Sequence, residues 1–148
     1  MIPTPIYEAF ALVLGDAPLA KFPGVPLIFA TETSELPESY LVLSVSLSAV
    51  AGMRANRTAE YTAEFSLCLR PENFSGDQVS AAVEDLVSAL ENSATAEALS
   101  SASETLASDP AFFRRCVFHS AFVERVAAPT FSLDRIVVAV SLSGTVQF

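Results

Sequence analysis

Two neighbouring stretches of the chain alternate between hydrophobic and polar residues. In residues 40–50 leucine, valine and alanine occupy every second position, and serine occupies most of the positions between them. Residues 61–70 alternate in the same way. A period of two is typical of a β-strand with one buried face. Because the polar segment 52–59 joins the two stretches, they predict an antiparallel hairpin whose loop projects beyond the sheet.

Hydrophobic residues recur at helical spacing in two other stretches. Residues 6–14 end at Gly15 and predict a helix of about ten residues. Ser75 and Gln78 have the spacing of a capping box, so a second helix is expected to begin there, with an apolar stripe that continues to Leu90. The Ser- and Ala-rich insert 93–110 fits either a further weak helix or a loop.

The remaining segments complete a predicted α+β fold. Strands are expected at 112–126 and 136–146, and a short one at 27–30 within the Pro-rich segment 16–38, which is otherwise an extended arm or loop. The order helix, hairpin, helix, hairpin predicts one domain over residues 1–148. Its antiparallel sheet of about four or five strands is packed on one face by two helices.

The composition indicates extra apolar surface but no membrane-spanning segment. Of the 148 residues 51% are hydrophobic and 17% are charged, whereas about a quarter are charged in an average soluble domain. No apolar run approaches the roughly 18 residues that a membrane span needs, and the first residues lack the basic segment of a signal peptide. We therefore expect no membrane partner, and we expect the extra apolar surface to contact other protein subunits.

The charge and the candidate reactive residues argue against nucleic-acid binding and catalysis. The net charge is −9, and only eight residues are basic, which disfavours phosphate binding. Cys68 and Cys116 are expected to be buried thiols. His119 is the only histidine, and it has no metal-ligand spacing around it. Residues 116 and 119 are three apart on a strand, so a Cys-His pair would point to opposite faces.

Motifs of enzymes are absent from the sequence. It contains no nucleophile elbow, no phosphate-binding loop and no dinucleotide-binding fingerprint. A small-ligand or catalytic site would have to use His119, Tyr7, Tyr40 or Tyr61, and each is explained more simply as a core or rim residue. The sequence therefore predicts neither an enzyme nor a cofactor or metal site.

The succession of elements resembles the tail terminator and tail-completion proteins of long-tailed bacteriophages, also described as minor tail proteins. The stretch AEYTAEFSLCLRP, followed by the capped amphipathic helix, is the part most similar to that family. The resemblance implies a hexameric ring in the virion that caps the tail tube and joins it to the head-neck connector. DNA would pass through the lumen of the ring without specific binding. Segments 16–38 and 93–109 have no counterpart in the resemblance.

Three groups of residues are candidates for contacts with other subunits. The first is the tip of the hairpin loop, with Met53, Arg54 and Arg57, which is either a contact element or an ordinary solvated turn. The second is the pair Arg114 and Arg115. The third is the serine face of the first strand, which could pack against a neighbouring subunit, lie under the Pro-rich arm or be solvated; its members are Ser44, Ser46 and Ser48.

Four acidic residues are candidates for a lumen that repels DNA: Glu60, Glu64, Glu84 and Asp85. Two other functions stay open. One is a different neck, head-completion or tail-tube component, and the other is a small-ligand-binding or enzymatic α+β domain.

Overall fold

The computed structural model describes residues 4–15, 17–29, 37–47, 58–93, 96–107 and 117–147. Three helices and six strands lie within these ranges, and all six strands belong to one sheet. In chain order they are α1 (Thr4–Leu14), β1 (Leu27–Phe29), β2 (Tyr40–Leu47), β3 (Thr58–Leu69), α2 (Gly76–Ser93), α3 (Ala96–Ala107), β4 (Val117–Val126), β5 (Thr130–Phe131) and β6 (Ile136–Gln147).

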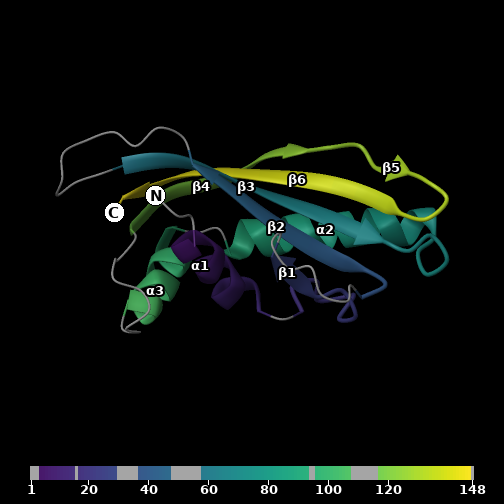
Figure 1. Ribbon diagram of the computed structural model, residues 1–148, viewed down its shortest axis with the longest axis horizontal. Coiled ribbons are helices and arrows are strands. Elements are labelled where there is room, and N and C mark those ends of the chain that lie inside the picture. The colour runs from purple at the N-terminus through teal and green to yellow at the C-terminus, as the bar shows by residue number, and fades with distance from the viewer. Residues whose placement is uncertain are drawn as a thin grey trace.

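The centre of the sheet is an antiparallel pair of its two longest strands. β3 and β6 are paired from Thr58 opposite Gln147 to Leu69 opposite Ile136. β2 lies antiparallel on the outer side of β3, and β1 follows it in parallel. β4 and β5 both pair with the other side of β6, one after the other along it. The sheet therefore ends in β1 at one edge and in β4 and β5 at the other (Figure 1).

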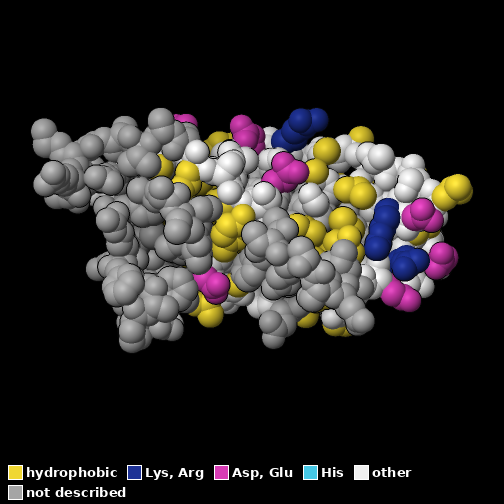
Figure 2. All heavy atoms as spheres, viewed as in Figure 1, with side chains coloured by type: hydrophobic (Ala, Val, Ile, Leu, Met, Phe, Trp, Pro, Cys, Tyr) yellow, Lys and Arg dark blue, Asp and Glu magenta, His cyan; other side chains and the backbone are white. Residues whose placement is uncertain are grey.

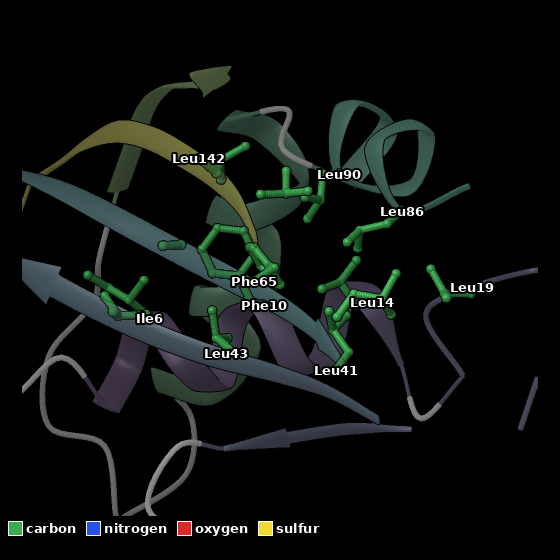
Figure 3. Packing of buried hydrophobic residues seen from close by; sticks show 14 of the residues in the cluster. Ile6, Phe10, Leu14, Leu19, Leu41, Leu43, Phe65, Leu86, Leu90 and Leu142 are labelled. Atoms are coloured by element: carbon green, nitrogen blue, oxygen red, sulfur yellow. The ribbon is translucent and has the colours of Figure 1, made fainter. Parts of the chain in front are cut away.

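All three helices lie against the same face of the sheet (Figure 1). Alternate residues of β3 are buried on that face, among them Phe65 and Tyr61, whereas Glu60 and Glu64 between them are exposed. The ring of Phe10 on α1 meets the Phe65 ring edge to face at 5.6 Å between centroids. Figure 3 shows how side chains from α1, α2 and the central strands fill this layer. The alternation in the sequence therefore gives the sheet two different faces, one buried under the helices and one without helices.

The start of α2 is the capping box that the sequence predicts. The backbone N–H of Gln78 donates to the Ser75 side-chain oxygen at 3.3 Å, and the Ser75 N–H donates to the Gln78 side-chain oxygen at 2.9 Å. These two bonds satisfy amides that a helix N-terminus otherwise leaves unpaired. Val79, Leu86 and Leu90 then form the buried stripe of the helix.

Side-chain hydroxyl groups accept hydrogen bonds from backbone N–H groups near both edges of the sheet. The N–H of Val45, beyond the end of the β1 pairing, donates to the Tyr7 hydroxyl. On the opposite edge the N–H of Phe118 donates to the Ser100 hydroxyl of α3 at 3.1 Å. β4 also has register shifts between Phe118 and Ser120 and between Val123 and Arg125. Capping and bulges of this kind make an edge strand a poor template for another strand.

The α+β class and the mostly antiparallel sheet are confirmed, and the structure adds detail. The insert 93–110 contains helix α3, which contacts α1 and β4, so the described part has three helices where two are expected. The Pro-rich segment contributes β1, whose parallel pairing with β2 departs from a fully antiparallel sheet. The sheet has six strands where about four or five are expected, since the short strand β5 also pairs with β6.

Candidate functional site

The side of the sheet that no described helix covers is here called the open face. Small hydroxyl side chains form rows across it. Ser46, Thr62 and Ser143 occupy one row on β2, β3 and β6. Ser44 pairs with Glu64 in the next row. Because cross-strand partners lie about 5 Å apart, these side chains form one continuous surface.

A shallow depression of about 340 Å³ lies in the open face, over β3, β6 and β4. Thr62, Ser143 and Thr145 contribute hydroxyl groups to its lining, and Phe122 contributes an exposed ring. Glu60 and Glu124 add carboxylates, and the Ser143 hydroxyl donates a hydrogen bond to Glu124. The depression is polar and wide, so it suits water better than an apolar ligand.

The described open face carries charged residues of both signs. Glu60, Glu64 and Glu124 are exposed on β3 and β4, Arg125 lies opposite Ser141 in the same row as Glu64, and Arg135 lies beside Tyr40 at the far end. Burying carboxylates of this kind against a protein partner costs several kcal/mol per ion unless each is paired. The arrangement therefore favours contact with water over a dry protein interface.

At the far end of the open face an aromatic and a thiol lie beside a cation. The Arg135 guanidinium is 5.2 Å from the centroid of the Tyr40 ring, and its Nη1 donates to the Glu38 backbone oxygen at 2.9 Å. Tyr40 pairs across the sheet with Cys68. Burial raises the pKa of the Cys68 thiol above its ordinary value, with smaller opposing effects from Tyr40 and Arg135. A thiol with a raised pKa is a poor nucleophile near neutral pH.

The structure divides the predicted lumen residues between two layers. Glu60 and Glu64 lie on the open face, close to Ser44 and Ser46. Glu84 and Asp85 belong to α2, in the helical layer. Asp85 there accepts a hydrogen bond from the Lys21 backbone N–H at 2.8 Å. The four acids therefore do not share one surface.

The other candidate contact residues lie outside the described ranges: Ser48, Met53, Arg54, Arg57, Arg114 and Arg115. Cys116 lies outside them as well, so its pairing with His119 is untested. His119 is exposed, and its Nε2 is 2.8 Å from the Gln147 side-chain oxygen. Among the residues that the structure describes, no group of three or more His, Cys, Asp and Glu side chains could hold a metal ion. No helix in the same part of the chain is both long and apolar enough to cross a membrane.

Two residues of the open face are absent from the sequence predictions. Phe122 and Glu124, two positions apart on β4, both line the depression. The spacing of Phe118 and Phe122 would place both on one face, but Phe118 is buried opposite Val146 whereas Phe122 is exposed opposite Ser143. The register shift between Phe118 and Ser120 displaces the alternation, and this shift leaves no signal in the residue pattern. Only the interruption of the apolar run by Glu124 and Arg125 could have indicated a wet surface.

Comparison with known proteins gives a fold relationship and no sequence family. No protein-family model matches the chain, and no curated protein matches its sequence. Twelve chains of solved structures are similar to it. One belongs to a structure described as "Virion of native gene transfer agent (GTA) particle". That chain superposes with a TM-score of 0.61 at 14% identity, over 96% of this chain and 93% of the other. At this identity the match establishes a shared fold along nearly the whole length.

Proposed function

We propose that this protein is a structural component of a phage-like virion and, more specifically, a tail terminator that assembles into a ring. The observation that carries the proposal is the full-length fold match to a chain from a gene transfer agent particle. The match covers nearly all of both chains, so it concerns a whole subunit and not a common substructure. A role that needs contact but no chemistry also agrees with the sequence, which lacks catalytic and phosphate-binding motifs.

In the proposed ring the open face lines the lumen. Its serine and threonine rows carry the carboxylates of Glu60, Glu64 and Glu124, which outnumber the cation of Arg125 opposite Ser141. Such a surface repels a polyanion and lets it slide past. Ser44 and Ser46 belong to this surface, so we place them in water and not in a dry contact between subunits. Glu84 and Asp85, being on α2, would lie away from the lumen.

The hairpin loop and the second arginine pair stay candidates for contacts with neighbouring virion proteins. In a chain of net charge −9, the cations of Arg54, Arg57, Arg114 and Arg115 are half of the eight basic residues. Reversing the charge of Arg54 and Arg57 should weaken assembly and leave the subunit folded. Unchanged assembly would make the loop an ordinary solvated turn.

The test of the ring is its mass in solution. Native mass spectrometry of the purified chain should give one closed oligomer, expected to be a hexamer, and negative-stain images should show rings with a central hole. Growth into long tubes would instead assign the chain to the tail tube. A monomer at all concentrations would contradict the proposal and favour a ligand-binding or enzymatic domain.

Its position in the particle needs a second experiment. Tail tubes assembled in the presence of the protein should stop at a ring and then accept the head-neck connector. Rings that bind connectors without stopping tube growth would identify another neck or head-completion component. These outcomes separate the terminator from virion proteins of similar fold.

A further inference from the structure

Two large hydrophobic side chains are exposed on the helix-covered side of the sheet, at its β4–β5 edge. Val126 lies opposite the buried Val140 of β6, and Phe131 lies opposite the buried Ile136. Cross-strand partners share a face, so both side chains point toward the helical layer, yet Val126 is 45% and Phe131 is 64% exposed. Hydrophobic side chains are visible in Figure 2 around the end where β5 and its turn lie. The described helices therefore leave part of their own side of the sheet uncovered.

Helix α2 directs a second pair of hydrophobic side chains toward this edge. Asp85 faces the opposite sheet edge, because it accepts a hydrogen bond from the Lys21 N–H in the segment before β1. Val83 and Val87, two positions before and after it, are turned away from Asp85 by about 160° around the helix axis. They are half-buried, and α2 contacts β4 and β6. The two pairs form what we call the docking strip: Val83, Val87, Val126 and Phe131.

The helical layer beside the docking strip is acidic. α1 carries one acidic residue, α2 four and α3 two, and none of the three helices contains Lys or Arg. A seven-residue spacing places three exposed acids of α2 in one row next to the flank of the two valines: Asp77, Glu84 and Glu91. The cations of the described residues lie elsewhere: Arg125 and Arg135 on the open face, Arg70 after the end of β3, and Lys21 on the Asp85 side of α2. A partner that fits the strip and the row together is therefore apolar and basic.

One segment of the chain combines these two properties. Residues 111–115, Ala-Phe-Phe-Arg-Arg, place two aromatic rings next to two arginines. Aromatic and Arg side chains are the commonest anchors of interfaces, and Arg binds a carboxylate through two parallel hydrogen bonds. The hairpin loop is basic as well, but its only large apolar side chain is Met53. Residues 111–115 are therefore the better match to the docking strip.

That segment cannot reach Phe131 of its own copy. Val117 pairs with Gln147 and Phe131 pairs with Ile136, so the two positions are separated by eleven residues of β6, or about 36 Å. Phe112 is five residues from Val117 in the sequence and lies within about 17 Å of it even in a fully extended chain. A contact between this segment and the whole docking strip therefore requires a second copy.

We propose that residues 111–115 of one copy bind the docking strip and the acidic row of the next copy, head to tail. Phe112 and Phe113 cover the strip, and Arg114 and Arg115 pair with the acidic row. This inference rests on the proposed ring and names the two surfaces that join its subunits, because a contact between two different surfaces can repeat around a closed ring. The open face takes no part in this contact and stays available to line the lumen.

The first experiment exchanges the charges. The segment variant, Arg114→Glu with Arg115→Glu, places acid against acid, and the α2 variant, Glu84→Lys with Glu91→Lys, places base against base. By native mass spectrometry each should be monomeric alone. An equal mixture of the two should assemble again, because every contact in an alternating ring then joins opposite charges. A ring in either variant alone, or no assembly in the mixture of two variants with folded circular dichroism spectra, overturns the inference.

Two further variants show which surfaces respond. Glu72→Lys with Glu97→Lys makes the same charge change at exposed positions outside the acidic row and should keep the ring. Arg54→Glu with Arg57→Glu changes the hairpin loop and should not assemble with the α2 variant. If this loop variant restores assembly of the α2 variant, the loop is the occupant and the inference is wrong.

The second experiment tests the apolar part of the contact. Phe131→Ser should weaken association about 30-fold or more, as expected for an aromatic anchor. Phe122→Ser is the matched control, because its ring is 58% exposed but lies on the open face, and it should keep the ring. Equal association of the two variants overturns the contact and leaves the proposed ring standing. A wild-type chain that is monomeric at every concentration overturns the ring and this contact together.

Discussion

The hydroxyl oxygen of Tyr7 accepts a hydrogen bond from the backbone N–H of Val45 at 3.0 Å. This contact joins the first helix to the edge of β2, next to where the pairing with β1 ends at Leu43. The amide of Val45 points away from β3, so it would otherwise need water. Helix α1 therefore supplies a hydrogen-bond partner to a backbone amide of the sheet and also contributes side chains to the core.

Replacing Tyr7 with Phe should lower the free energy of unfolding by about 1 kcal/mol, the net value of one such hydrogen bond. Urea denaturation would measure the change. Hydrogen exchange of the Val45 amide should accelerate, while amides in the centre of β3 keep their protection. Equal exchange at Val45 in both proteins would mean that the bond does not persist in solution.

Replacing Tyr61 with Phe should raise the free energy of unfolding or leave it unchanged, unlike the replacement of Tyr7. Tyr61 is 1% exposed, and its hydroxyl has no hydrogen-bond partner among the described residues. Its ring meets the Phe118 ring edge to face at 5.8 Å, a contact that Phe would keep. Because an unsatisfied buried hydroxyl costs about 1–3 kcal/mol, the variant should be as stable as wild type or more stable by up to about that amount. A clear loss of stability in urea would indicate that a water molecule bonds the hydroxyl.

Alkaline pH should destabilise the protein in part through Cys68. Burial raises the pKa of this thiol above its ordinary value of 9.0. The thiolate therefore forms more readily in the unfolded chain, and the stability that is present below pH 9 is lost as the pH rises through the folded pKa. The free energy of unfolding of wild type should fall more steeply above pH 9 than that of Cys68→Ala. Tyr61 is common to both proteins, and Cys68→Ala also removes the contribution of Cys68 to the raised pKa of Tyr40. Both effects make the slope of the variant shallower, so equal slopes would contradict this assignment.

Replacing Ser46 with Glu tests whether the open face is wet. If it lines a lumen, the variant should assemble normally, and its stability should change by no more than about 0.5 kcal/mol, as for other surface substitutions. Native mass and urea denaturation would measure the two quantities. Dissociation of the assembly would place Ser46 in a protein interface, where a buried unpaired carboxylate is costly.

Replacing Glu64 with Lys tests the electrostatic role of the same face. Glu64 is exposed and pairs across the sheet with Ser44 and Ser141. The variant ring should retain double-stranded DNA at low salt and release it as salt rises, because each copy then offers a cation to phosphate. Glu72→Lys, on the turn before α2, makes the same charge change away from the open face. Equal DNA retention by both variants would argue against a lumen lined by the open face.

Much of the fold could be predicted because its signals are local. The alternation around Phe65 fixes which face of β3 is buried, and the Ser75–Gln78 box fixes where α2 begins. The helix over Ala96–Ala107 was ambiguous because its serines favour turns as much as helices. Its packing against α1 and β4 decides the outcome, and such tertiary contacts are not visible in the residue order.

The surface was less predictable than the core. The sequence indicates that Ser44 and Ser46 share one face of their strand, and it suggests an uncharged surface there, but it does not indicate that Glu64 lies directly opposite Ser44. Likewise, the exposure of Leu133 depends on a turn at the end of the sheet, and its apolar side chain alone would suggest a core position. The hydrophobic periodicity shows which residues of one strand share a face. The order of the strands in the sheet determines which residues of different strands lie side by side.

The pairing of β3 with β6 has a consequence for how the chain folds. β4 precedes β6 in the sequence, yet it joins the sheet only through β6, which must also reach back to β3 across two intervening helices. Until β6 has been synthesised, β3 has one strand partner and β4 has none. Contacts of such long range slow folding and leave strands exposed meanwhile. We therefore expect the nascent chain to stay incomplete, and dependent on chaperones, until its final strand leaves the ribosome.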